Sequence, residues 1–553
     1  MLRRAMGSLR ERIGESLAAL REVFQNPPLR RVQLAFAGQV VGQYAYSIAI
    51  AVYAYRQGGA AAVGLVACVR LLAAAAVAPF ASVLADRYRR ERVMLGSDLV
   101  RAALVAAVGG IVLAGGPALA VYALATVTTI AGTVFRPAEA ALMPALARTP
   151  EELTAANVSS STFDSLGSFL GPALGGLLLA VASPGWVFLA MAVCFLWSAS
   201  FVARVRGPAP ARAAAHAGGA WAETGAGFRA IAAEPRLRLL IGLYGAQAVV
   251  AGALGVLVVV TALDLLEMGN AGVGFLESAS GIGSLLGAGV ALALIARKRL
   301  AADFGLGIVL WGAPLVLLGL WPNVGVALVA LAVVGIGNTL VDIAAMTLLQ
   351  RTAPEEVAGR VFGVLQSVLV GAIGLGSIAA PLLISLTSPR VALVVVGAVL
   401  PALAALRWRQ LAAIDDAAEP VPDERVEALR RISIFTPLPL RTLELLASRL
   451  KDVVVPVGNT LFVRGESGGH FYVVVDGELE ILLDGETKLE REYVGEIALL
   501  RGVPRTATVR AHTDAHLWAL GRDDFLTAVT GHAGASEAAN EVVGARLGYA
   551  PTA

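Results

Sequence analysis

The stretch Tyr493–Ala511, YVGEIALLRGVPRTATVRA, places a glycine, a carboxylate, a short turn and a basic residue close together. Gly495 allows the backbone to approach a ligand closely, and Glu496 can accept hydrogen bonds from sugar hydroxyl groups. Residues 497–500 read as one helical turn whose free N–H groups suit an anion. Arg505 adds a planar, permanently charged fork that matches phosphate oxygens. The stretch therefore predicts a site for one phosphate and one sugar.

This stretch resembles the phosphate-binding cassette of the cyclic nucleotide-binding domain, in which G-E-[IL]-A-[LM] is followed by P-R-[TA]-A-T-V. The family usually has a Gly-Asp pair just before the cassette, where this chain has Arg491 and Glu492. A hydroxyl directly after the arginine suits a syn guanine, so the resemblance leans towards cGMP, although threonine also occurs there in relatives that take cAMP. The regulatory ligand implied is therefore cAMP or cGMP. The resemblance assigns nucleotide binding to Gly495, Glu496, Ile497, Ala498, Arg505 and Thr506.

The composition indicates that most of the chain lies in lipid. Hydrophobic residues make up 57% of the 553 residues, charged residues 15%, and the mean hydropathy is +0.73. A soluble domain carries about 25% charged residues. The net charge of +3 gives no reason to expect a nucleic-acid partner. Cys68 and Cys194 lie in apolar runs, and we find no metal cluster, Walker loop or nucleophile–base pair, so the sequence predicts neither a metal site nor an enzyme.

About twelve apolar runs have the ~20 residues needed to cross a bilayer. Their approximate cores are 33–55, 60–82, 94–114, 117–136, 157–182, 185–203, 238–260, 272–295, 303–321, 324–349, 361–386 and 390–407. The loops between these runs alternate in charge: every second loop is rich in basic residues, and the loops between those hold almost no basic residue beyond Arg56 and Arg390. The positive-inside rule therefore predicts a multi-pass protein of the cell (plasma or inner) membrane with both termini in the cytoplasm. The basic loops carry Arg87, Arg89, Arg90, Arg92, Arg204, Arg206, Arg297, Lys298, Arg299, Arg351 and Arg360.

The two halves of the membrane region repeat. RTPEEL at 148–153 and RTAPEEV at 351–357 each precede a glycine-rich span with a proline near its end. A parallel repeat of six spans is the arrangement of a rocking transporter with its site between the halves. The predicted boundaries are 1–32 for a basic, amphipathic cytoplasmic lead-in, 33–206 for the N-terminal six-helix half, 207–235 for a cytoplasmic bridge, 236–410 for the C-terminal six-helix half, 411–424 for a linker and 425–549 for the cyclic nucleotide-binding domain.

Residues 30–410 resemble the major facilitator superfamily, in particular twelve-span exporters related to enterobactin and macrolide efflux proteins. LADRYRRERV at 84–93 matches part of the family's G-x-x-x-D-R-x-G-R-R loop, with Ser82 and Arg89 in place of its two glycines. GSFLGPALGG at 167–176 matches the G-x-x-x-G-P-x-x-G-G motif associated with antiporters, and FRPAEAALMPAL from Phe135 is typical of the exporter subgroup. Tight helix packing alone is the alternative role of those glycines. The resemblance implies conformational roles for Asp86, Arg87, Arg90, Gly171, Pro172, Gly175 and Gly176.

Ionisable residues inside the spans are costly in lipid and are candidates for function. Asp98 and Arg101 lie three positions apart and could pair on one helix face, and we favour for them a stabilising role at the cytoplasmic end of the N-terminal half. Glu277 and Asp342 lie deeper in the C-terminal half and are the better candidates for proton coupling or for a cationic substrate.

The C-terminal region predicts a small α+β domain. A helical pattern begins at 426, strands are predicted at 453–463, 470–486, 506–511 and 516–521, and helices follow to 546. Asp-Gly turns are expected at 476–477 and 484–485. The predicted fold class is an all-α membrane protein with two six-helix halves, followed by a β-roll with flanking helices.

These features predict a proton-coupled exporter of a lipophilic, drug-like or siderophore-like molecule, regulated by cyclic nucleotide. The expected partners are the lipid bilayer, the cyclic nucleotide and a small-molecule substrate, with no resident cofactor. Two alternatives remain: a non-transporting, membrane-anchored nucleotide sensor, and an exporter whose C-terminal domain is a ligand-free scaffold.

Overall fold

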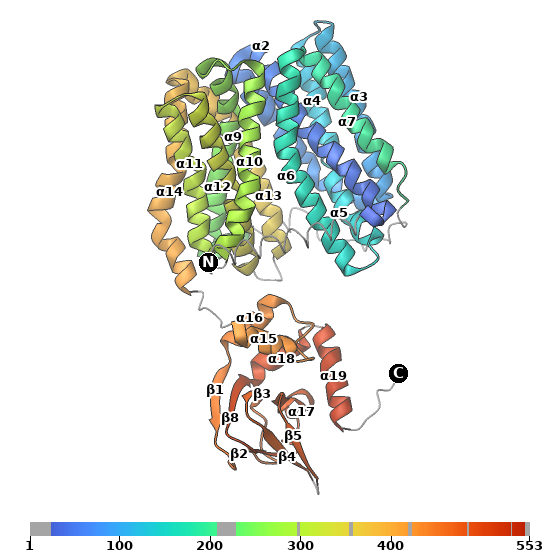
Figure 1. Cartoon of the computed structure of the whole chain (residues 1–553), viewed down its shortest axis with the longest axis vertical. Helices are drawn as coiled ribbons and strands as arrows, with labels where there is room; N and C mark the ends of the chain where they lie inside the picture. Colours follow the sequence, from blue (N-terminus) through green and yellow to red (C-terminus); the bar gives the residue numbers. More distant parts are fainter. Residues whose placement is uncertain are drawn as a thin grey trace. The chain divides into compact units, whose positions relative to one another are not determined.

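The computed structural model describes residues 24–206, 228–295, 299–352, 358–417, 423–483, 486–531 and 533–547 (Figure 1). The chain divides into two compact units, Met1–Asp415 and Asp416–Ala553. The predicted basic lead-in and cytoplasmic bridge fall largely outside the described residues.

The first unit is a bundle of long helices. Eleven helices in its described part are long and apolar enough to cross a membrane. They account for all twelve predicted runs, because α2 contains the first two, joined by a kink at Gly58 and Gly59. Gly59 has φ +62°, a conformation that favours glycine. By element, the described helices are α2 (Pro27–Arg87), α3 (Arg90–Leu113), α4 (Ala118–Gly132), α5 (Phe135–Leu146), α6 (Pro150–Val181), α7 (Pro184–Val202), α9 (Pro235–Val260), α10 (Gly269–Ile295), α11 (Leu300–Leu320), α12 (Val324–Thr352), α13 (Ala358–Leu386) and α14 (Pro389–Ala417), with a π-helical turn η1 (Thr261–Leu265) after α9. Helices α4 and α5 together form one of the eleven spans.

Local sequence signals explain where some of these helices begin and end. The repeated RTPEE motif starts α6, where the Thr149 hydroxyl accepts a hydrogen bond from the Glu152 N–H (3.2 Å) and Pro150 occupies the first turn. Asp415, near the end of α14, accepts hydrogen bonds from the N–H groups of Ala301 (2.9 Å) and Ala302 (2.8 Å). This carboxylate therefore caps α11 and fixes the end of α14 against it.

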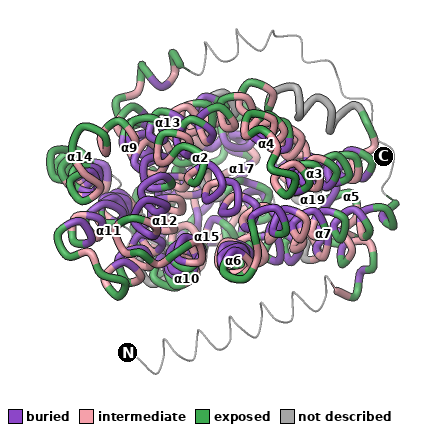
Figure 2. The backbone as a smooth tube through the Cα atoms, turned by 90° about the horizontal axis from the view of Figure 1, so that it is seen from above, coloured by how far each residue is buried: buried purple, intermediate pink, exposed green. Residues whose placement is uncertain are grey.

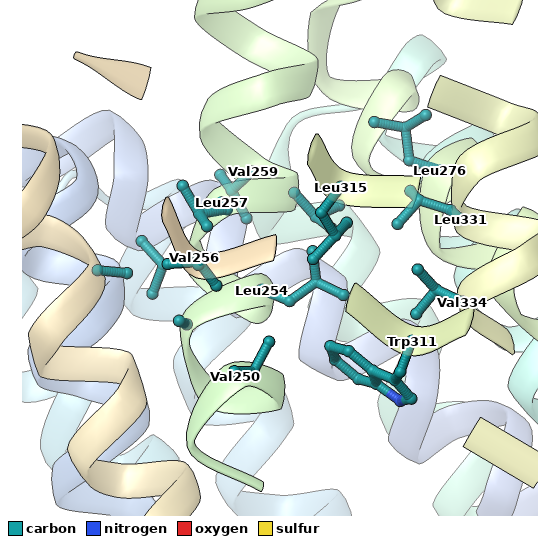
Figure 3. Packing of buried hydrophobic residues seen from close by; sticks show 14 of the residues in the cluster. Val250, Leu254, Val256, Leu257, Val259, Leu276, Trp311, Leu315, Leu331 and Val334 are labelled. Carbon is teal, nitrogen blue, oxygen red and sulfur yellow. The ribbon is translucent and has the colours of Figure 1, made fainter. Parts of the chain in front are cut away.

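The core of the bundle is rich in branched aliphatic side chains. Leu254, Leu257, Leu315 and Val334 pack together with Trp311 between α9, α11 and α12 (Figure 3). Most residues of α9 are buried, whereas α14 exposes many of its residues (Figure 2). An all-round apolar helix such as α9 suits the middle of a bundle.

The second unit contains two four-stranded sheets whose strand pairs are all antiparallel. The first sheet has the order β1 (Lys451–Val455), β8 (Ala515–Gly521), β3 (His470–Asp476), β6 (Tyr493–Val494). The second has the order β2 (Thr460–Phe462), β7 (Thr508–Ala511), β4 (Leu479–Leu483), β5 (Glu486–Glu490).

The expected turn at Asp476 and Gly477 forms, with Gly477 at φ +87°. It does not join a hairpin, because β3 belongs to the first sheet and β4 to the second. The second expected Asp-Gly turn, at 484–485, lies outside the described residues. It falls between β4 and β5, which do pair with each other.

In the described part of this unit, five helices flank the sheets: α15 (Asp423–Arg431), α16 (Leu440–Ser448), α17 (Glu496–Arg501), α18 (Arg522–Thr530) and α19 (Ala533–Leu547). One buried cluster, including Phe435, Phe471 and Phe525, joins helices to the first sheet. Another, including Phe462 and Leu517, lies between the sheets. The predicted fold class, a helical membrane region followed by a small sheet domain with flanking helices, is confirmed. The last membrane helix continues to Ala417, beyond the predicted end of its half at 410.

Candidate functional site

The predicted cassette lies between the strands β6 and β7. Gly495 precedes α17 and has φ +98°, which a residue with a side chain rarely adopts. A Cβ at this position would lie 2.6 Å from Nη1 of Arg505 and 3.0 Å from the carbonyl oxygen of His470. Both the backbone conformation and the lack of space therefore require glycine here.

Arg505 is 4% exposed and is held by three other segments. Its Nη1 donates to the carbonyl oxygen of Gly495 (3.1 Å) and its Nη2 to that of His470 (2.8 Å). The guanidinium lies over the ring of Phe462, with Cζ 4.0 Å from the centroid. Burial lowers the pKa of the Arg505 guanidinium, and the group stays charged because its ordinary pKa is so high.

One donor of this guanidinium remains available. The Nε atom of Arg505 is buried and has no hydrogen-bond partner in the described part of the chain. An unused charged donor in a buried setting is costly, and an anion is the partner that would satisfy it.

A small cavity joins the predicted residues. Gly495, Glu496, Ile497, Ala498, Arg505 and Thr506 all line it. Glu496 is 1% exposed, and Thr506 is exposed. The first N–H groups of α17 have no acceptor within the helix. The cavity thus brings together a carboxylate, a guanidinium and the N–H groups at the start of α17.

Phe462 also lines this cavity, and local sequence gave no reason to expect it. It comes from β2, which pairs with β7 and so faces the cassette from a distant part of the sequence. The cavity measures about 60 Å³, well below the ~300–1,000 Å³ of ordinary small-molecule sites. A nucleotide would therefore require side chains such as Phe462 to move.

The two residues that depart from the family pattern lie on the surface beside the cassette. Arg491 forms an ion pair with Glu478, and the carbonyl oxygen of Glu492 accepts a hydrogen bond from the N–H of Val474 (2.8 Å). Neither residue lines the cavity.

In the membrane unit, the glycines of 167–176 face two different helices. A Cβ at Gly171 would lie 2.5 Å from Cβ of Tyr44, and one at Gly175 would lie 3.1 Å from Cα of Ala45, both on α2. A Cβ at Gly176 would lie 2.9 Å from Cα of Gly274 on α10, in the other half. Pro172 lies inside α6, between these contacts. The motif therefore packs α6 closely against its own half and across the interface between the halves.

Asp98 and Arg101 form no hydrogen bond or ion pair with each other, and each bonds to a different helix. Asp98 accepts a hydrogen bond from the Ser198 hydroxyl (2.5 Å), whereas Arg101 donates to the side chain of Gln43. Arg101 also lies over the ring of Phe195, with Cζ 4.1 Å from the centroid. Both side chains point to other helices because packing, rather than spacing along α3, decides their partners.

Asp342 belongs to a hydrogen-bonded network within the C-terminal half. It accepts hydrogen bonds from the Tyr244 hydroxyl (2.6 Å) and from Nδ2 of Asn338 (3.0 Å). Oδ1 of Asn338 in turn accepts from Nε1 of Trp311 (3.0 Å) and Nε2 of Gln247 (3.3 Å). Asp342 is therefore fixed by several helices.

Glu277 differs from Asp342. It lies on α10, and its side chain makes no hydrogen bond or ion pair with a residue that the structure describes. The next residue, Ser278, donates to the carbonyl oxygen of Phe169 on α6 (3.0 Å), so this part of α10 lies against the other half. Glu277 is thus a carboxylate without a described partner at the interface between the halves.

The loop motif is only partly described. The side chains of Asp86 and Arg87 lie outside the described residues. Arg90 begins α3, and its Nε is buried without a hydrogen-bond partner in the described part of the chain.

Sequence reasoning missed a buried carboxylate in the N-terminal half. Glu139 on α5 is 2% exposed and accepts a hydrogen bond from the Ser160 hydroxyl (3.2 Å). Ser160 also accepts from Nε2 of Gln33 (2.9 Å). An acidic residue within the apolar segment FRPAEAALMPAL was the signal that could have revealed it.

A second missed contact joins the halves. The hydroxyl of Tyr55, on α2, donates to Asp264 of the π-helical turn η1. This bond lies at the ends of α2's first span and of α9, on the side opposite to the arginine-rich loops.

Comparison with known proteins agrees with this architecture. The sequence profile of the Major Facilitator Superfamily matches residues 34–374 and again 304–463, and that of the cyclic nucleotide-binding domain matches 452–532. A solved POT family transporter, in complex with a thioalcohol-conjugated peptide, superposes with a TM-score of 0.55. It is 13% identical and covers 71% of this chain and 99% of its own, so the likeness concerns the fold alone.

Two curated relatives match short stretches of this chain. A cAMP-dependent protein kinase regulatory subunit from Yarrowia lipolytica is 37% identical over 102 residues, which are 18% of this chain and 27% of the subunit. An uncharacterized protein of Mycobacterium tuberculosis is 43% identical over 96 residues, 17% of this chain and 19% of that protein. This chain thus covers about a quarter or less of either relative. The profile matches show that the chain belongs to the Major Facilitator Superfamily and carries a cyclic nucleotide-binding domain at its C-terminal end.

Proposed function

We propose that this protein is a secondary active exporter whose transport cycle is regulated by a cyclic nucleotide bound in its C-terminal domain. Membership of the Major Facilitator Superfamily supports the transport role, and the second profile supports nucleotide binding. The observation that carries the regulatory part is the buried, unpartnered Nε of Arg505 in the cassette cavity.

In this proposal different cassette residues bind different parts of the nucleotide. Arg505 and the N–H groups of Ile497 and Ala498 hold the phosphate, and Glu496 accepts hydrogen bonds from the ribose hydroxyl. Gly495 lets the backbone approach the ligand. The phosphate would draw the guanidinium from its present carbonyl partners, which links ligand binding to β3 through His470. The ring of Phe462 would move with it, because it stacks on the same guanidinium.

The identity of the nucleotide rests on two opposing arguments. The Yarrowia relative is named as cAMP-dependent, and its identity of 37% favours cAMP as the ligand. Thr506 lines the cavity and would offer its hydroxyl to a guanine, which favours cGMP. We propose cAMP as the first ligand to test and cGMP as the second, with calorimetry on the same preparation.

We propose Glu277 as the principal proton carrier. A charged carboxylate without a partner inside a membrane helix is costly, and a group that binds and releases a proton avoids that cost during the cycle. Asp342 already accepts two hydrogen bonds, so its role in coupling is secondary in this proposal. Asp98 and Arg101 serve mainly to hold α3 against its neighbours.

The small residues of α6 provide the surface for the rocking motion. Gly176 and Gly274 allow the backbones of α6 and α10 to touch across the interface between the halves. Alternating access requires such a contact to slide or separate. Pro172 lies where α6 changes from one partner helix to the other, which suits a hinge.

The arginine-rich loops support an orientation with both termini in the cytoplasm of the cell membrane. The exporter-like segments at 135–146 and 167–176 support outward transport of a lipophilic, drug-like or siderophore-like molecule. A membrane-anchored sensor would not need the unpartnered carboxylate or the close interface. A scaffold domain would not need the free donor of Arg505.

The transport proposal is tested by efflux of a fluorescent lipophilic cation from cells, with and without a protonophore. We expect efflux to stop with the protonophore and with Glu277→Gln. Glu267→Gln is the matched control, because Glu267 is exposed and lies ten residues earlier, before α10. Efflux that is insensitive to the protonophore would contradict antiport, and normal efflux by Glu277→Gln would exclude Glu277 as the carrier.

A further inference from the structure

A cavity of about 680 Å³ lies between the beginning of α9 and the final turns of α14. Arg236, Arg238 and Arg407 line it, and no acidic side chain does. None of these arginines forms an ion pair with a residue that the structure describes, although Arg407 donates to Oε1 of Gln410 (3.2 Å). The cavity therefore presents three positive charges without a described counter-charge.

The other part of the cavity is apolar. Leu239 and Leu243 follow the arginines along α9, and Leu403 precedes Arg407 on the antiparallel helix α14. Leu243 lies seven residues beyond Arg236, about 10 Å further along the helix axis. On α9 the arginines lie nearer the start of the helix than Leu243, and on α14 Leu403 lies one turn deeper than Arg407, although Ala413 and Ile414 also line the cavity beyond Arg407.

The cavity has room for a ligand beside α9. Gly242 lines it, and a Cβ added there would meet no other atom within 4 Å. The charged end lies where the apolar span of α9 begins, on the same side of the bundle as the arginine-rich loops. The charged end of the cavity therefore lies at the depth of the lipid headgroups.

We infer that this cavity binds an acidic phospholipid, with its phosphate on the three arginines and an acyl chain along the leucines. Basic pockets between membrane helices are suited to anionic headgroups. A free phosphate would satisfy the arginines equally well but would leave the leucine-lined part unused. The pairing of charge with an apolar extension at this depth therefore favours a lipid. This inference does not depend on the cyclic nucleotide site.

The test is native mass spectrometry of the full-length protein in detergent, with equal amounts of phosphatidylglycerol and phosphatidylcholine. We expect preferential retention of phosphatidylglycerol. Arg238→Gln and Arg407→Gln should each reduce that retention about fivefold, since a basic residue near anionic lipid contributes on this scale. Arg409→Gln is the matched control, because Arg409 is exposed on α14 but does not line the cavity.

A second pair of variants tests the cavity itself. Gly242→Leu should fill the apolar part and remove the retained lipid, whereas Gly255→Leu should not. Gly255 lies on the same helix and also has open space at its Cβ position, but it is outside the cavity. Thermal unfolding of each variant shows whether the bundle remains folded.

Equal retention of the two lipids would overturn the proposal, and so would equal losses in the control variants. Competition by glycerophosphoglycerol at the same concentration as the whole lipid would also overturn it, because the occupant would then be a soluble phosphoester. Competition only by lipids that carry acyl chains would support it.

Discussion

Replacing Arg505 with alanine should lower both the stability of the C-terminal domain and its affinity for a nucleotide. The guanidinium ties the beginning of β3 to the cassette through His470 and Gly495, and it covers one face of Phe462. The side chain is therefore part of the domain's structure before any ligand arrives. These contacts therefore predict that the variant domain is less stable than the unchanged one.

The expected loss of stability follows from these contacts. Each hydrogen bond from a charged donor contributes ~1.5–3 kcal/mol, and a buried cation–π contact ~0.5–2 kcal/mol. Removing the buried charge also removes its desolvation cost, which offsets part of the loss. We expect the free energy of unfolding to fall by roughly 2–4 kcal/mol. Loss of the phosphate contact should weaken nucleotide binding ~30-fold to several thousand-fold.

Both quantities can be measured on residues 416–553, which form a compact unit with its own buried clusters. Urea unfolding can be followed by the fluorescence of Trp518, the only tryptophan in that stretch. Calorimetry with cAMP and cGMP gives the affinity at a temperature where the variant remains folded. Arg505→Lys should give intermediate values, because it keeps the charge but loses the fork.

Arg510→Ala is the control. Arg510 lies five residues after Arg505, on β7, where it is exposed and forms an ion pair with Glu480. Surface ion pairs contribute at most ~1 kcal/mol. The site assignment is wrong if Arg505→Ala binds either nucleotide as tightly as the unchanged domain. An unaltered free energy of unfolding would show that the two carbonyl contacts contribute nothing.

Three further predictions concern other parts of the chain. Gly495→Ala should abolish nucleotide binding and should lower the free energy of unfolding more than Gly502→Ala does. Both glycines have positive φ, but only Gly495 lacks space for a Cβ. Urea unfolding measures both losses, and equal losses would show that the clash at Gly495 is relieved. Asp415→Ala should lower the melting temperature of the full-length protein, because it removes the cap of α11 at a cost of ~0.5–2 kcal/mol. Asp415→Asn should restore part of the lost stability. Identical melting temperatures of the unchanged protein and both variants would refute the cap. Reporter fusions at Ala553 and within 323–326 should give opposite topology signals, and matching signals would mean that the span count is wrong by one.

Local patterns explain why much of the fold was predictable. A membrane span needs only a long apolar run, so all twelve runs appear in the sequence. Partners across the fold were not predictable in the same way. Asp98 and Arg101 are suitably spaced to pair on one helix, yet each bonds to a helix distant in sequence.

The same limit applies to the nucleotide cassette. The residues from Gly495 to Thr506 lie in one stretch, and their chemistry together with the resemblance of that stretch to the family's cassette identified them. Phe462 and His470 come from β2 and β3, and they reach the cassette only through the strand order of the two sheets. The sequence likewise did not distinguish Glu277 from Asp342. Asp342 accepts hydrogen bonds from two donors whereas Glu277 has no described partner, and this difference arises from packing between helices.

Transport by the full-length protein in proteoliposomes, with nucleotide added on the side of the C-terminal domain, tests the regulatory claim most directly. The assay follows a fluorescent lipophilic cation under an imposed pH gradient, at increasing concentrations of cAMP and of cGMP. We expect one of the two nucleotides to change the transport rate of the unchanged protein, and Arg505→Ala to retain transport but lose that response. A transport rate of the unchanged protein that stays constant up to saturating concentrations of both nucleotides would contradict regulation and favour the scaffold role of the domain.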